Sequence, residues 1–395
     1  MFARIIVKID TVKIKVKNIF FLKYLFLFII INLGLYLFIT QCNSWLPLEQ
    51  SFHSQRKLDF FLQDSRIVSQ RFDLINNLAQ YDAQWYLKIA SQAYKNNQLS
   101  FAFFPLYPLL LGSVNYFLKN IVLTAFLLSN LLLIGNFTVF YFLMSKFFRK
   151  TVVIKAAFLL FLFPFSIFFR SYFAESLFLL LLIVFTYFLL SKRYFWPAFI
   201  LGLMNVTKAN VFLLNIYFLI NYYQYFKQKK IAWKNIFFII LLLVLPTIGW
   251  LIYCHLTTGD VFVFLKVRSN WFYDAKPPFF IFYNLKKIID FPFLPWHFYY
   301  NSKIEVLTIL AIFFLLFKNK KAVRPELWWI SFCLYLLPLL TTTTMSFIRY
   351  QIVSFPLFLI LAKKLKGWRY FLLLGIFAVG LLTASLFFIN WYWLG

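Results

Sequence analysis

The chain has 395 residues, of which 63% are hydrophobic and only 13% are charged, and its mean hydropathy is +0.78. Soluble domains are usually near half apolar and a quarter charged, so this balance excludes an ordinary soluble enzyme and predicts a multi-span membrane protein. The net charge of +28 could suggest a nucleic-acid partner, but the basic residues fall between apolar runs and form no patch within a soluble domain. We therefore expect the lipid bilayer, and no nucleic acid, as a partner.

The first predicted elements are an anchor and a loop. Residues 1–19 are basic, and the apolar run 20–40 that follows is long enough to cross a hydrocarbon core of ~30 Å. This run is too long for a signal-peptide core and lacks a small-residue cleavage site, so we expect an uncleaved anchor and a cytoplasmic N-terminus. Residues 41–100 are polar, and the segment 41–120 predicts an extracytoplasmic loop with structure of its own. Within it, the short apolar stretch 101–118 predicts a juxtamembrane or dipping helix rather than a full crossing.

The rest of the chain predicts a helical bundle. Together with the anchor, the later apolar runs give about eleven transmembrane helices, an all-α polytopic fold in which residues 20–395 form one domain. In this arrangement more than half of the 40 basic residues are cytoplasmic, whereas of the 12 acidic residues only Asp10 and Glu326 are. This asymmetry follows the positive-inside rule and explains the net charge. The later spans are predicted at 121–145, 152–169, 174–191, 195–207, 209–225, 236–253, 304–317, 326–344, 348–362 and 370–392.

The most distinctive stretch is Tyr81–Pro108, which begins YDAQWYLKIASQAY. On a helix, Asp82, Tyr86, Ile89 and Ala93 would share one stripe, because they recur at helical spacing. The Asp82 carboxylate would then lie on an apolar face. The alternative is a helix N-cap, a position that aspartate favours.

Further ionisable residues are predicted on the same outer side. Such residues at membrane depth are costly and by default functional; the alternatives are snorkelling to the interface and, for Glu175, a local pair with Arg170. Together with Asp82 and the loop 258–278, which holds Asp260, they predict one outward-facing site. Each of the following interrupts or closes an apolar run: Arg170, Glu175, Lys208 and Arg349.

The residue types favour one chemistry. The chain has no GxxxxGK[ST], GxGxxG, HExxH or CxxC motif. A carboxylate with cations beside a membrane suits group transfer from a lipid phosphate to a hydroxyl, with the carboxylate as general base and the cations stabilising the departing phosphate. One base without a nucleophile implies single displacement with inversion. Because side chains alone can hold one phosphate, no obligatory metal or other cofactor is expected, and Asp59 and Asp64 are interpreted as a solvated helix face.

An ordered set of motifs over residues 81 to 362 resembles the GPI mannosyltransferase II (PIG-V) family of integral-membrane glycosyltransferases, which have the GT-C fold. Its opening pattern, WDxxWYxxIAxxGY and then FFPLYPLL, is matched here except that Tyr81 replaces Trp and Ala93 replaces Gly. Ala209-Asn210-Val211 also departs from the family's Pro-Asn-Gly, which puts the choice of sugar or acceptor in doubt. The matching positions are Asp82, Trp85-Tyr86, Ile89-Ala90, Tyr94, Phe103–Leu110, Phe163-Pro164, Tyr172, Glu175-Ser176, Thr207-Lys208, Asn210, Gly259-Asp260, Phe264, Trp271, Arg349-Tyr350 and Phe355-Pro356.

The resemblance implies a polyprenyl-phosphate donor from which a hexose, mannose in the family, passes to a lipid-linked or cell-surface glycan acceptor outside the cytoplasm. It implies Asp82 as the base. The Phe- and Lys-rich composition is typical of bacteria, so we expect a bacterial inner or plasma membrane and no GPI acceptor; for a eukaryotic source the expected membrane is the endoplasmic reticulum. The candidate donor-binding residues are Trp85, Tyr86, Arg170, Glu175, Lys208, Asn210, Asp260, Arg349 and Tyr350.

Two other functions remain open at the level of the sequence. A flippase or transporter of polyprenyl-linked sugars would also need many spans and intramembrane charges. Transporters often have pseudo-symmetric halves, however, and no internal repeat is visible in the chain. An inactive relative that serves as a scaffold is the other alternative, and the retained Asp82 argues against it.

Overall fold

The protein is described by a computed structural model, and the regular elements of the described residues are all helical, with no strand among them. The prediction of an all-α protein is therefore confirmed. The described residues are 2–49, 61–95, 98–209, 211–228, 233–267, 280–295, 302–340 and 344–394.

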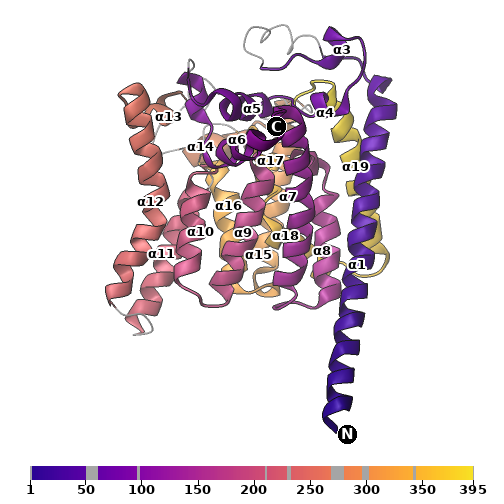
Figure 1. Ribbon diagram of the computed structural model, residues 1–395, viewed down its shortest axis with the longest axis vertical. Coiled ribbons are helices and arrows are strands. Elements are labelled where there is room, and N and C mark those ends of the chain that lie inside the picture. The colour runs from indigo at the N-terminus through magenta and orange to yellow at the C-terminus, as the bar shows by residue number, and fades with distance from the viewer. Residues whose placement is uncertain are drawn as a thin grey trace.

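The longer helices run side by side along the long axis of the molecule (Figure 1). Every predicted apolar run corresponds to one or more of these helices, so the sequence placed the helical segments correctly. The bundle consists of α1 (Phe2–Cys42), α7 (Ile121–Met144), α8 (Lys150–Phe161), α9 (Glu175–Leu190), α10 (Phe195–Asn205), α11 (Phe212–Lys227), α12 (Trp233–Thr258), α15 (Lys303–Lys318), α16 (Pro325–Leu339), α18 (Phe355–Lys364) and α19 (Trp368–Ile389).

Two predicted spans are interrupted. The run 152–169 ends as an α-helix at Phe161, and the 3-10 helix η3 (Pro164–Phe169) follows. The run 348–362 is divided between α17 (Phe347–Gln351) and α18, which has a proline in its first turn. Proline lacks the backbone N–H that would continue a preceding helix, so it begins a new one.

Among the described residues, four helical segments are long and apolar enough to cross a membrane. The remaining bundle helices are shorter or carry more charge, so the transmembrane count of about eleven stays a prediction. The four segments are compatible with a membrane protein; they are Ile19–Trp45, Ile121–Met144, Asn235–Thr258 and Trp368–Ile389.

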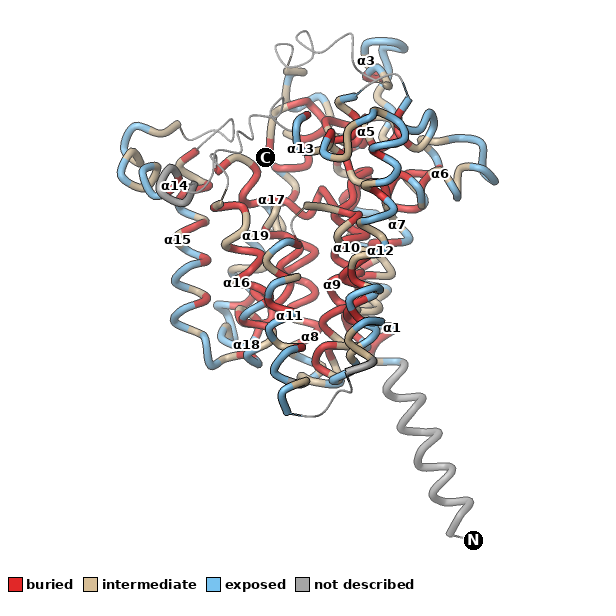
Figure 2. The backbone as a smooth tube through the Cα atoms, turned by 90° about the vertical axis from the view of Figure 1, so that its left-hand side faces the viewer, coloured by how far each residue is buried: buried red, intermediate tan, exposed pale blue. Residues whose placement is uncertain are grey.

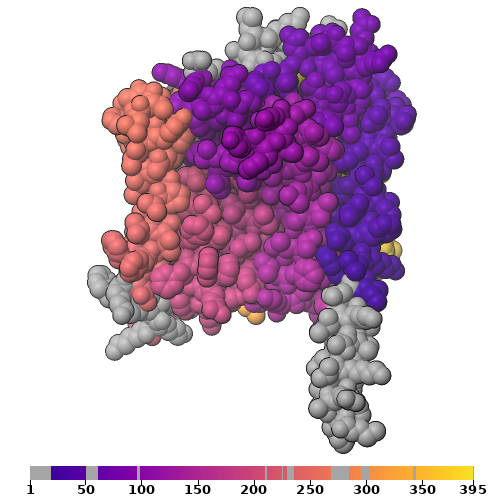
Figure 3. Space-filling view, viewed as in Figure 1, coloured from indigo at the N-terminus to yellow at the C-terminus, as the bar shows by residue number. Residues whose placement is uncertain are grey.

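Shorter helices gather at one end of the bundle, the upper end in Figure 1, where the purple surface of Figure 3 covers the ends of the longer helices. The predicted structured loop after the anchor supplies most of them. This end layer holds α3 (Ser65–Val68), α4 (Leu74–Asn77), α5 (Ala83–Gln92), η2 (Gln98–Ala102), α6 (Leu106–Leu118), α13 (Val263–Lys266), α14 (Phe280–Ile289) and α17.

The core lies along α9, which is buried over most of its length (Figure 2). Close helix packing contributes to it. A Cβ atom at Gly202 would lie 2.5 Å from the carbonyl oxygen of Leu242. Only glycine at this position therefore allows α10 to lie so near α12. Small residues allow the same close approach between membrane helices.

The helix α6 tests the predicted topology of the stretch 101–118. With 13 residues it is about 20 Å long, short of the ~30 Å that a crossing needs. We expect cysteines placed at Asn115 and Lys119 to react with a membrane-impermeant thiol reagent added outside the cell. Reaction from the cytoplasmic side alone would show that this stretch crosses the membrane.

Candidate active site

Four ionisable side chains from four separate parts of the chain meet where the end layer covers the bundle. Arg349 Nη1 donates a hydrogen bond to Asp82 Oδ2 at 2.9 Å, and Arg349 Nε donates to Glu175 Oε1 at 2.7 Å. Lys208 Nζ donates to the same Glu175 oxygen at 2.8 Å. The order Asp82–Arg349–Glu175–Lys208 therefore alternates negative and positive charges. We call these four residues the charge chain.

The charge chain is buried at Glu175 and open at Asp82. The side chain of Glu175 is fully buried, those of Arg349 and Lys208 are 7% and 12% exposed, and that of Asp82 is 19% exposed. Of the two carboxylates, Asp82 is thus the one that a substrate can reach. The buried Glu175 holds both cations in place.

The local backbone explains how Asp82 comes to face Arg349. Asp82 directly precedes α5, but its side chain makes no capping hydrogen bond to that helix. Asp82 therefore occupies the N-cap position, as the alternative expected, but its carboxylate does not cap the helix and instead contacts Arg349, 267 residues later. The predicted stripe holds for the buried Tyr86 and Ile89 but not for the exposed Ala93, because α5 ends at Gln92.

Glu175 is the first residue of α9. A carboxylate at the first turn of a helix is stabilised by the positive end of the helix dipole, which suits a buried anion between two cations. The carboxylate does not pair with Arg170, so the local-pair alternative for Glu175 is wrong. Its partners come from α17 and from the turn after α10 instead.

Arg349 is fixed from several sides. Its guanidinium carbon lies 4.8 Å from the ring centre of Phe168 and 4.5 Å from that of Phe173, distances at which cation–π attraction operates. The helix α17 that carries Arg349 begins after Ser346, which has a φ of 65°. Glu305, which is 1% exposed, accepts hydrogen bonds from the Thr344 hydroxyl and the Phe347 backbone N–H.

A small pocket of about 90 Å³ opens beside the charge chain. A cavity needs roughly 10–15 Å³ for one water, so this pocket accommodates about half a dozen water-sized groups, the scale of a phosphate and part of a sugar. It is lined by Asp82, Tyr86, Ala102, Phe103, Phe104, Thr207, Lys208, Ala209, Met345, Ser346, Arg349, Tyr350 and Trp393.

A much larger apolar groove, of about 1450 Å³, lies next to this pocket. Its walls come from α5, α6, α10 and the candidate membrane span α12, with Leu109, Leu203 and Trp250 among its lining residues. The backbone N–H of Leu106 donates to the carbonyl of Val206 at 2.9 Å. These two residues line the groove, and the nearby Phe104 and Thr207 line the pocket, so this paired stretch of chain borders both cavities.

The structure brings together most of the ionisable candidates that the sequence singled out. Beyond the charge chain, Tyr86 and Tyr350 line the pocket, and the Lys208 ammonium lies 5.2 Å from the ring centre of Tyr350. Asn210 lies outside the described residues. The aromatic wall residue Trp393 was missed, and the aromatic run Trp391-Tyr392-Trp393 was the available signal for it.

Three other candidates lie outside the lining of the pocket. Arg170 is fully buried and donates to Asn32 of α1 and to backbone and hydroxyl oxygens of η3 and α8. Trp85 stacks on Phe103 with ring centres 5.6 Å apart. Asp260 pairs with the exposed Lys266. None of the three lines the pocket, so their role in donor binding stays a prediction.

Comparison with known proteins gives no match to a protein-family model, a curated protein or a solved structure. The resemblance to the PIG-V family and the GT-C fold therefore stays a prediction from the motifs. In the part of the chain that the structure describes, no three His, Cys, Asp or Glu side chains gather as metal ligands would.

Proposed function

We propose that the protein is an inverting glycosyltransferase that moves a hexose, mannose in the family that it resembles, from a polyprenyl-phosphate donor to a hydroxyl of a lipid-linked or cell-surface glycan. The observation that carries this proposal is the open Asp82 carboxylate in direct contact with Arg349, at a pocket that adjoins an apolar groove. A base, a cation for phosphate and a place for a lipid chain thus lie together. The ordered motifs add the GT-C architecture and the donor class.

In the proposed reaction, Asp82 accepts the proton of the acceptor hydroxyl while that oxygen bonds to the anomeric carbon of the sugar. The bond from this carbon to the phosphate oxygen breaks, and its electron pair stays on the phosphate. Attack from the face opposite the phosphate inverts the anomeric configuration. The donor phosphodiester carries one negative charge and the released polyprenyl phosphate carries up to two, so negative charge grows as the bond breaks.

Arg349 and Lys208 are suited to stabilise that growing charge. Both are already positioned by Glu175, so little reorganisation is needed at the moment of reaction. As the phosphate engages Arg349, the guanidinium exchanges its bond to Asp82 for one to the phosphate. Asp82 then becomes available to the acceptor hydroxyl.

The apolar groove supports a lipid-borne donor. A polyprenyl chain needs an apolar surface that is continuous with the bilayer, and α12 is one of the described helices long and apolar enough to cross it. A lipid that enters between α6 and α12 would reach the pocket at Leu106 and Val206. Its phosphate would then lie near Lys208.

The proposal is tested with purified protein, radiolabelled polyprenyl-phosphate mannose and a lipid extract of the source cells. We expect the label to move to a new lipid or glycan, and the rate to be unchanged in a metal chelator because side chains alone hold the phosphate. Loss of activity in the chelator that Mn²⁺ or Mg²⁺ restores would contradict the metal-independent site. Failure to transfer any of several polyprenyl-linked sugars, with movement of the intact lipid across vesicles, would favour the flippase instead.

A further inference from the structure

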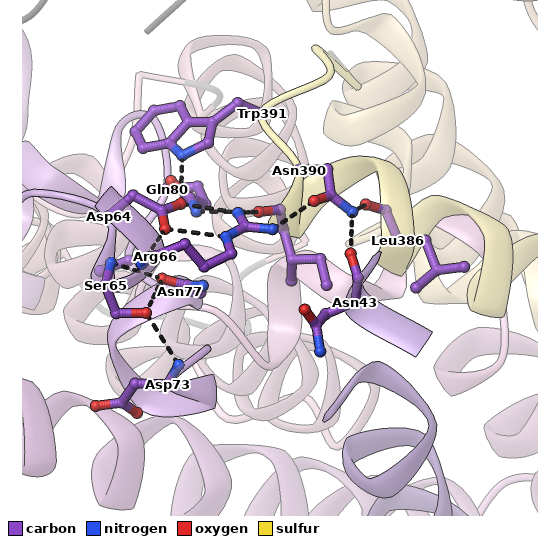
Figure 4. Close-up of polar contacts among 12 residues, drawn as sticks. Asn43, Asp64, Ser65, Arg66, Asp73, Asn77, Gln80, Leu386, Asn390 and Trp391 are labelled. Carbon is purple, nitrogen blue, oxygen red and sulfur yellow. Dashed lines mark hydrogen bonds and ion pairs between the residues drawn. The ribbon is translucent and has the colours of Figure 1, made fainter. Parts of the chain in front are cut away.

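The chain segment that follows α19 is locked into the end layer by the buried Asp64, which is 3% exposed (Figure 4). The indole N–H of Trp391 donates to Asp64 Oδ2 at 2.9 Å. Arg66 binds both Asp64 oxygens, at 3.0 and 2.8 Å, and also donates to Asn390 Oδ1 and to the carbonyl of Ile389. Asp64 is therefore not on a solvated helix face, and the interpretation of the sequence is wrong for this residue; Asp59 lies outside the described residues.

Further hydrogen bonds hold the same segment. The side-chain amide of Asn390 donates to the backbone carbonyl of Asn43, and the backbone carbonyl of Asn390 accepts from the backbone N–H of Glu49. Gln80 Nε2 donates to the carbonyl of Ile389 at 3.4 Å. Asn390 thus ties the end of α19 to the segment after α1, and the carbonyl of the adjacent Ile389 ties it to Gln80, just before Asp82.

The Asp64–Arg66 pair is ionised at neutral pH. Burial alone would raise the pKa of Asp64, but the hydrogen bonds and the charge of Arg66, with the hydrogen bond from Trp391, hold that pKa below its usual range. A carboxyl group whose pKa is lowered in the folded state stabilises the fold above its unfolded pKa and loses this effect as pH falls. We call the contacts of Asp64 and Arg66 with residues 389–391 the lock. The lock is therefore complete near neutral pH and weakens in acid.

The locked segment encloses the residue next to the proposed base. The ring of Tyr81 lies edge-on to those of Phe388, Trp391 and Trp393, with centre distances of 5.6, 5.4 and 5.2 Å. Tyr81 also has a φ of 54°, a left-handed conformation that non-glycine residues keep only where the surroundings enforce it. Because Tyr81 directly precedes Asp82, the three rings constrain the direction of the Asp82 backbone.

Trp393 links the segment to the site directly, since it contacts Tyr81 and also lines the pocket of Asp82, Lys208 and Arg349. We propose that residues 389–393 position the Asp82 carboxylate and that Asn390, Arg66 and Trp391 are the positioning residues. This inference rests on the proposed function, in which Asp82 is the base. Since misplacement of a reacting group by ~1 Å can cost about 100-fold in rate, loosening the lock should slow transfer without removing any group from the pocket.

The test compares Asn390→Ala with Thr383→Ala, a control on the exposed face of the same helix whose hydroxyl bonds only within α19. We expect Asn390→Ala to lower kcat by about ten-fold or more while KM for the donor changes less than about two-fold, because the pocket groups remain. Trp391→Phe, which keeps a ring against Tyr81, should retain more activity than Trp391→Ala. Equal kcat in Asn390→Ala and wild type, or a loss that appears only in KM, would overturn the proposal.

A second readout does not depend on turnover. The backbone N–H groups of Ala83, Gln84 and Trp85 donate to the carbonyls of Gln80, Tyr81 and Asp82, so their hydrogen exchange reports the order of these residues. In Asn390→Ala we expect this exchange to accelerate at least about ten-fold while that of α9 is unchanged. If wild type transfers no sugar, the proposed function fails, and the exchange result alone still decides whether the segment orders Asp82. Unchanged exchange at Ala83–Trp85, or equal acceleration in α9, would contradict the positioning role.

Discussion

The Asp82→Asn variant is expected to transfer sugar at least about 100-fold more slowly than wild type, because general base catalysis typically contributes 10²–10⁴-fold. The amide has nearly the same shape and its oxygen can still accept the hydrogen bond from Arg349, but it cannot take the proton of the acceptor hydroxyl. The change therefore separates chemistry from folding. Single-turnover transfer from radiolabelled polyprenyl-phosphate mannose measures it.

The matched control is Asp73→Asn. Asp73 lies in the same end layer, is exposed, and caps α4 by accepting from the backbone N–H of Ile75. Asparagine caps helices about as well as aspartate, so this variant should keep the wild-type rate. If Asp82→Asn also keeps the wild-type rate while eluting and melting normally, Asp82 is not the base and the proposed mechanism is wrong.

The sequence could predict where the helices lie because hydrophobic length is a local property. The apolar run 121–145 became α7, whose N-cap Asn120 accepts from the backbone N–H of Leu123. The ends of elements were less predictable. The run 152–169 reads as one apolar segment, yet Pro164 divides it, and the run 326–344 ends as a helix at Leu339.

The site could be predicted as a set of residue types but not as a set of contacts. Costly charges such as Glu175 and Arg349 stand out in an apolar sequence. Their pairing, over a separation of 174 residues, depends on how α9 and α17 pack, which no local pattern records. The lock between Asp64 and Trp391 joins residues 327 apart and was invisible for the same reason.

Replacement of Arg349 is expected to have the second large effect, on rate and on stability. Lysine keeps the charge but cannot bond to Asp82 and Glu175 at once or lie flat between the rings of Phe168 and Phe173. We expect Arg349→Lys to lower kcat by about 100-fold, the scale of losing one donor to a developing anion. Because the ammonium remains, the fold should persist.

Arg349→Met removes the charge and leaves Glu175 buried with Lys208 as its remaining ion-pair partner among the described residues. Breaking a buried pair in this way typically destabilises a protein by about 3–5 kcal/mol. A lower melting temperature in detergent is therefore expected for Arg349→Met but not for Arg349→Lys. The control Arg324→Lys, at an exposed arginine before α16, should change neither kcat nor the melting temperature. Full activity of Arg349→Lys would show that a positive charge alone is sufficient at this position. The hydrogen bonds of Arg349 to Asp82 and Glu175 would then stabilise the fold without contributing to sugar transfer.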